Sequence, residues 1–130
     1  MLTLHPSPFT LPMTTAEFEK LVDKALKRLP AFFKSKMQNV VLTVADKPTK
    51  TQERRSGRGL LGLYEGVPLL DRTSYYSGTM PDKITIFQKN IEAQCATPEE
   101  VEKEVRHVVM HEIAHHFGIT DEELRQKGLY

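Results

Sequence analysis

The chain has 130 residues, which is enough for one domain with a modest core, and its 39% hydrophobic and 27% charged content is ordinary for soluble proteins. A net charge of +1 argues against a globally basic nucleic-acid-binding protein. The single cysteine, Cys95, cannot form an internal disulfide, and no run approaches the ~20 apolar residues of a membrane span. We therefore expect a cytoplasmic protein with no membrane partner, and Cys95 to be an ordinary thiol.

The N-terminal part of the chain divides into a lead-in and a helix. Residues 1–13 hold three prolines and no apolar run, which predicts an extended or disordered segment and not a signal peptide. A capping box that starts at Thr14 then begins a helix, and Pro30 ends it. Apolar residues recur at helical spacing between these two points, so this helix faces a core. We expect the folded domain to span 14–130.

Three strands are predicted next, over 39–46, 60–66 and 83–88, from their β-branched and aromatic content. Glycines in the second of these segments, with Pro68 just after it, suit an edge strand. Such an edge can bind an extended peptide by strand addition, here along Leu61, Gly62, Leu63 and Tyr64. An ordinary edge strand that binds nothing remains an equally open interpretation.

Two polar segments separate these strands and are predicted to be loops. The first, 47–59, shows no periodicity and carries Lys47, Lys50, Arg54, Arg55 and Arg58 against Glu53. A solvated loop is favoured over a basic arm for nucleic acid or acidic substrate, because no aromatic residue interleaves the charges. The second loop contains Tyr75 and Tyr76. A phenol near a metal could stabilise an oxyanion, but nothing in the sequence places either ring there.

The strongest signal is a long helix that carries an H-E-x-x-H motif. Thr97 and Pro98 mark its start, and Gly118 marks its end near residue 117. His111 and His115 lie one turn apart, with Cβ atoms about 5–6 Å from each other, so both imidazoles can point at one zinc ion. Glu112 then lies beside the metal, where a general base can take a proton from zinc-bound water.

Asp121 is a candidate third ligand. It completes the pattern H-E-x-x-H-x-x-G-x-x-D, in which Gly118 can reverse the chain. Three protein ligands leave one position open, which is typical of a catalytic zinc site. Thr120 to Glu123 also reads as a capping box, in which Asp121 would be only an acid favoured by the helix dipole. The ligand role is favoured over this one, and both roles can hold together.

Two other histidines accompany the motif. His116 points away from the metal and is expected to pack or to support a ligand. His107 lies one turn before His111 and is expected either to support that ligand or to face solvent.

With these motifs in place, the sequence resembles the minimal zincin family of bacteria, which are small metalloprotease-like proteins of poorly defined role. The matching stretches are 13–22, 39–41, 62–69, 81–87 and 105–121. The resemblance implies an α+β fold: one zincin-like domain whose small mixed β-sheet packs against an N-terminal helix and the H-E-x-x-H helix. It also implies Zn2+ on His111, His115 and Asp121, with Glu112 as the base. Asp121 stands where full metzincins have a third histidine, and no methionine follows it to build their Met-turn.

These features predict a zinc-dependent metallopeptidase that hydrolyses peptide bonds through zinc-bound water, with a peptide or protein as substrate. One alternative is a zinc-dependent endoribonuclease-like hydrolase, because small bacterial rRNA-processing endoribonucleases use a His-x3-His-x5-His site with the same ligand spacing. The aspartate at position 121 and the Glu112 base fit a peptidase better, so nucleic acid is not the expected substrate. The other alternative is a non-catalytic zinc-binding interaction module.

Overall fold

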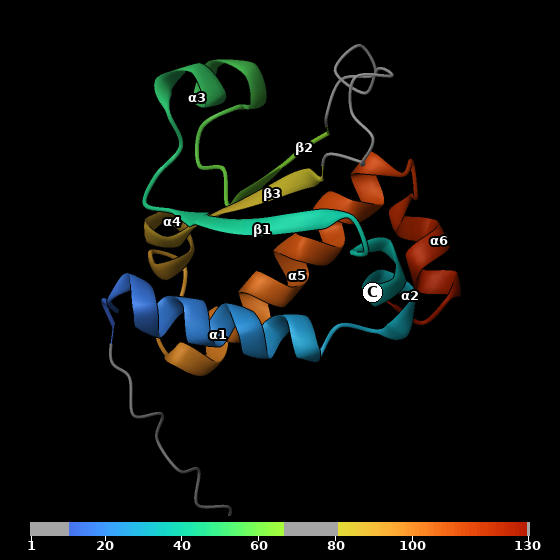
Figure 1. Ribbon diagram of the computed structural model, residues 1–130, viewed down its shortest axis with the longest axis horizontal. Helices are drawn as coiled ribbons and strands as arrows, with labels where there is room; N and C mark the ends of the chain where they lie inside the picture. The colour runs from blue at the N-terminus through green and yellow to red at the C-terminus, as the bar shows by residue number, and fades with distance from the viewer. Residues whose placement is uncertain (1–10, 67–80, 130) are drawn as a thin grey trace, which may run out of the picture.

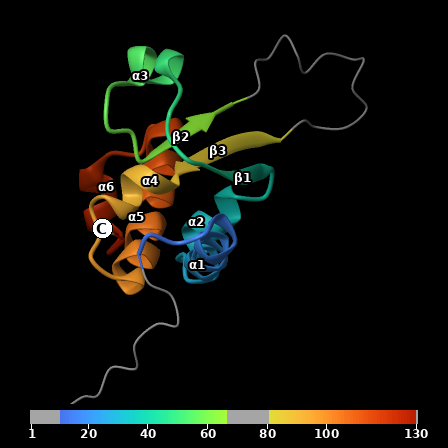
Figure 2. The ribbon, with the colours of Figure 1, turned by 90° about the vertical axis from the view of Figure 1, so that its left-hand side faces the viewer.

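In the computed structural model, residues 11–66 and 81–129 are described, and they form a small sheet with helices packed mainly on one side of it (Figure 1). The elements in chain order are α1 (Thr15–Lys27), α2 (Ala31–Lys36), β1 (Val40–Ala45), α3 (Lys50–Ser56), β2 (Gly62–Glu65), β3 (Asp82–Phe87), α4 (Gln88–Glu92), α5 (Pro98–His116) and α6 (Asp121–Gln126). Figure 2 shows α1 and α5 beneath the sheet and α3 beyond its opposite side. The predicted α+β class is confirmed.

The sheet is mixed and has the strand order β1-β3-β2. β1 runs parallel to β3 with Val40 opposite Asp82, and β2 runs antiparallel to β3 with Gly62 opposite Ile86. Residues 84–87 of the central strand are all buried, as expected for a strand covered on both faces. Within the described residues β2 is an edge strand, as predicted.

Helix α5 forms the centre of the core. The Thr97 hydroxyl accepts a hydrogen bond from the backbone N–H of Glu100 at 3.2 Å, and Pro98 occupies the first turn, so the helix begins where predicted. Its residues at i, i+4 spacing are completely buried: Val101, Val105, Val109 and Ile113. This stripe packs against α1, which buries Phe18, Leu21, Val22 and Ala25.

The predicted loop over 47–59 is wrong in part, because Lys50–Ser56 forms helix α3. A complete capping box starts this helix: the Thr49 hydroxyl accepts from the Gln52 N–H at 3.1 Å, and the Gln52 side chain accepts from the Thr49 N–H at 2.9 Å. None of its residues is buried. Without a buried face the segment has no apolar periodicity, which is why it resembled a loop.

The remaining differences are small. The apolar link after Pro30 is the short helix α2, and α4 begins directly after β3, where no separate helix was predicted. Of the predicted lead-in, residues 1–10 lie outside the described residues, whereas Met13 is buried in the core. Pro68, Tyr75 and Tyr76 also lie outside them. Across the described parts of the chain, no helix combines the length and apolar character that crossing a bilayer requires.

Candidate active site

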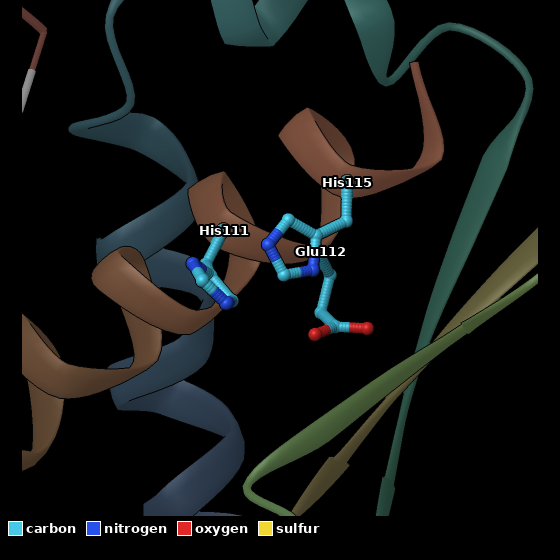
Figure 3. A group of neighbouring side chains, drawn as sticks. All are labelled: His111, Glu112 and His115. Carbon is cyan, nitrogen blue, oxygen red and sulfur yellow. The ribbon is translucent and has the colours of Figure 1, made fainter. Parts of the chain in front are cut away.

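The C-terminal half of α5 brings His111, Glu112 and His115 together (Figure 3). One potential ligand atom from each residue lies within 4.8 Å of the others, and the two imidazole centroids are 4.0 Å apart. The predicted convergence of the two histidines is therefore present. It follows from their spacing of four residues on a regular helix, which places one above the other.

The donor set of this cluster fits a divalent transition metal. Imidazole nitrogens and a carboxylate oxygen are ligands that Zn2+ accepts. His111 and Glu112 are half-buried and His115 is exposed, so the cluster opens to solvent. An accessible site of this kind suits an ion that must also contact a substrate.

Glu112 is held by the edge strand. Its Oε1 accepts a hydrogen bond of 3.0 Å from the backbone N–H of Tyr64, and Figure 3 shows the carboxylate extending toward β2. In an antiparallel pair, the backbone N–H and C=O groups of successive residues point alternately toward and away from the partner strand. Those of residues 62 and 64 point away from β3 and toward this carboxylate. The outer edge of β2 and the proposed base thus face each other.

Gly62 allows β2 to lie this close to α5. A Cβ built on Gly62 would stand 2.6 Å from the Val108 Cγ1 and 3.2 Å from the Thr85 carbonyl oxygen. Val108 is β-branched and sits on a helix, so its methyl group cannot turn away easily. Only glycine permits the approach that brings the Tyr64 N–H to Glu112.

A cavity of about 350 Å³ adjoins the histidines. Its lining residues come from the segment before β2 and from α5: Arg58, Gly59, Leu60, Leu61, Gly62, Glu104, His107, Val108, His111 and Glu112. Of the predicted substrate-binding residues, Leu61 and Gly62 line it, whereas Leu63 and Tyr64 do not. Substrate binding by all four stays a prediction. The His107 ring lies 6.4 Å from that of His111 and faces the same cavity.

A second cluster, not foreseen as a unit from the sequence, ties the end of α5 to the sheet. The Tyr64 ring stacks on His116 with centroids 3.9 Å apart, and the Tyr64 hydroxyl donates to Asp82 at 2.8 Å. The His116 Nε2 lies 3.9 Å from the same carboxylate. His116 therefore packs against Tyr64, which is one of the two roles predicted for it. Asp82 was missed because its nearness to Tyr64 depends on the pairing of β2 with β3.

Gly118 reverses the chain after α5 as predicted, with φ of 68°. The Ile119 N–H donates to the Ala114 carbonyl at 2.8 Å and the Gly118 N–H donates to the His115 carbonyl at 3.2 Å, which is a Schellman motif. The Thr120 hydroxyl then accepts from the Glu123 N–H at 3.1 Å and starts α6 at Asp121. The capping role of this segment is confirmed.

Asp121 itself is exposed and is not among the residues gathered around the two histidines. Its position in the first turn of α6 is the one that a helix dipole favours for an acid. Its role as a third ligand stays a prediction.

The comparison with protein families agrees with this geometry. A family model described as "Zincin-like metallopeptidase" matches residues 37–129, which include the whole sheet, α5 and α6. No curated protein matches the chain. Since the match covers well over half of the residues and contains the His111, Glu112 and His115 cluster, the chain belongs to the zincin-like metallopeptidase family.

Proposed function

We propose that this protein is a zinc-dependent metallopeptidase, in which His111 and His115 hold the ion and Glu112 is the general base. The observation that carries this proposal is the convergence of these three side chains next to an edge strand whose backbone holds the Glu112 carboxylate. Membership of a metallopeptidase family supports the same reaction class.

When bound at this site, zinc would polarise the scissile carbonyl and lower the pKa of the attacking water toward neutrality. Glu112 takes a proton from that water as its oxygen bonds to the carbonyl carbon. The same carboxyl then gives the proton to the leaving amine as the C–N bond breaks. The Tyr64 N–H donates to Oε1 of Glu112, which leaves Oε2 to accept and donate the proton. This hydrogen bond keeps the Glu112 carboxyl group oriented during both transfers.

The outer edge of β2 is the proposed support for the substrate backbone. The alternation of the ladder turns the N–H and C=O of Gly62 away from β3 and toward α5. An extended peptide that pairs with this edge would lie over the cluster on α5. Asp121 is proposed as the third protein ligand, with the H-E-x-x-H-x-x-G-x-x-D spacing as its support.

The decisive experiment compares the wild type with Glu112→Gln by metal analysis and by digestion of denatured proteins. Glutamine keeps an oxygen that can accept from the Tyr64 N–H, but it cannot act as a base at neutral pH. We expect the variant to retain zinc and to lose hydrolysis by about 100-fold or more. Cleavage by Glu112→Gln at the wild-type rate would remove Glu112 from the mechanism.

The same preparations separate the other two functions. Zinc-dependent cleavage of single-stranded RNA, with proteins left intact, would establish the endoribonuclease-like alternative. Stoichiometric zinc with neither RNA nor protein cleaved would establish an interaction module.

A further inference from the structure

The segment before β2 presents a cationic surface, which we call the basic flap and define as Lys47, Lys50, Arg54, Arg55 and Arg58. Three of these residues belong to α3, which stands apart from the rest of the fold in Figure 1. Over residues 11–66 and 81–129, no carboxylate forms an ion pair with any member of the basic flap. Its positive charge is therefore available to a ligand.

Arg58 connects this surface with the active site. It lines the cavity of about 350 Å³ that His111 and Glu112 also line. It lines as well a second hollow of about 550 Å³, together with Lys50, Glu53 and Arg54. Arg58 is a wall of both hollows, so its side chain borders the cavity at the histidine cluster and also the hollow on α3. The sequence alone favours a solvated loop here, whereas the structure places one of its cations, Arg58, in the wall of the cavity that His111 and Glu112 line.

Two carboxylates also line these hollows. Glu53 lies on α3 and Glu104 on α5, against the three cations Lys50, Arg54 and Arg58. Glu104 and Arg58 both line the cavity at the histidines, whereas Lys50, Arg54 and Arg58 line the hollow on α3 with Glu53. The hollow on α3 therefore carries a positive excess, and Arg58 lies shortly before β2, the strand that would support a peptide backbone.

We propose that the basic flap is a specificity subsite that binds acidic side chains of the peptide substrate on one side of the scissile bond. This inference rests on the proposed peptidase function and names its substrate class. Arginine binds carboxylates through paired N–H donors, which gives geometric selectivity as well as attraction. Peptide is favoured over nucleic acid because residues 47–58 contain no aromatic side chain on which a base could stack.

The test measures binding to zinc-loaded Glu112→Gln protein, so that it does not depend on turnover. Fluorescent peptides carry Glu or isosteric Gln, first before and then after a fixed central bond. We expect the Glu peptide to bind more tightly at one of the two positions. Each of Arg54→Gln and Arg58→Gln should weaken it by about threefold, and the double change by about tenfold. Raising the salt from about 0.05 M to about 0.5 M should remove most of the preference.

A matched control is Lys24→Gln, which makes the same change in net charge at an exposed cation of α1. Helix α1 lies on the opposite side of the sheet from α3 (Figure 2). Lys24→Gln should leave the Glu peptide affinity unchanged. Equal affinity for Glu and Gln peptides, or equal loss in Lys24→Gln and Arg58→Gln, would overturn the subsite. Tighter binding of single-stranded RNA than of any peptide, lost in the Arg54 and Arg58 variants, would also overturn it.

Failure of this inference is distinguishable from failure of the peptidase proposal. A wild-type enzyme that cleaves peptides without regard to acidic residues would refute the subsite alone. Acidic peptides bound through Arg54 and Arg58, with no cleavage by the wild type, would refute the peptidase alone.

Discussion

Helices α5 and α3 lie on either side of the edge strand and differ in almost every physical respect. α5 buries Val101, Val105, Val109 and Ile113 completely, whereas α3 buries none of its residues. The histidine cluster is on the first helix and most of the basic flap is on the second. In our two proposals, the hydrolytic chemistry, which needs fixed geometry, lies on the packed helix, and recognition by charge lies on the exposed one.

The difference between the two helices is tested most directly by one weakening substitution in α5 and one at the start of α3. Ile113→Ala should lower the free energy of unfolding by about 2–5 kcal/mol, because a completely buried side chain is removed from the core. Thr49→Ala removes the cap of α3 and should change global stability by less than about 0.5 kcal/mol, since no core contact depends on that helix. Urea denaturation of both variants measures the two effects. Comparable losses would mean that α3 belongs to the same cooperative unit.

Gly62→Ala tests the contact between β2 and α5. The new Cβ meets the Val108 methyl group at 2.6 Å, so β2 and α5 must shift relative to each other, and we expect the Tyr64 N–H to lose its hydrogen bond to Glu112. We expect hydrolysis to fall by at least about tenfold and stability by about 1–3 kcal/mol. Val108→Ala in the same chain removes the clashing methyl group and should restore much of both. A double variant as impaired as Gly62→Ala would show that the close approach is not what the glycine provides.

Asp121→Ala separates the two roles of the first residue of α6. A lost ligand should weaken zinc binding by about tenfold or more, whereas a lost helix-dipole contact should cost only about 0.3–1 kcal/mol of stability. Glu122→Ala, one residue further along the same exposed turn, is the matched control. Competition with a zinc-binding dye gives the affinity of each variant. Equal zinc affinities for the two variants would make Asp121 a helix-start residue only.

The smallest expected effect concerns Cys95, which precedes α5 in the packed region. Burial, and then the carboxylates of Glu104, Glu100 and Glu92, raise the pKa of the Cys95 thiol. A raised pKa lowers the thiolate fraction of the folded protein near pH 8, and the thiolate is the reactive form. Iodoacetamide should therefore alkylate the native protein several-fold more slowly than the urea-unfolded chain. Faster alkylation of the native protein would contradict the pKa direction.

Helix α5 and its motif were predictable because every signal is local. Thr97 and Pro98 start the helix, Gly118 ends it, and the interval of four residues fixes the nearness of His111 and His115. α3 offered only the Thr49–Gln52 capping box, which is a weaker signal than periodicity.

Contacts across the sheet were not predictable from the sequence. The bond between Glu112 and Tyr64 joins residues 48 positions apart, and it depends on the packing of β2 against α5. The Tyr64 hydrogen bond to Asp82 depends on the register of β2 with β3. The pattern of residue types does not specify the order of the strands, so these two hydrogen bonds could be identified only from the structure.

The hydrogen bond that orients Glu112 has a consequence for how such a site varies. Its donor is the backbone N–H of residue 64, which every amino acid except proline provides. Substitution of residue 64 by alanine would therefore not remove this hydrogen bond. A one-residue slip of β2 would instead turn that amide toward β3 and leave the carboxylate without its anchor. Replacing this one backbone amide by an ester would remove the N–H and leave every side chain unchanged. It would therefore isolate the contribution of the strand backbone to the orientation of Glu112.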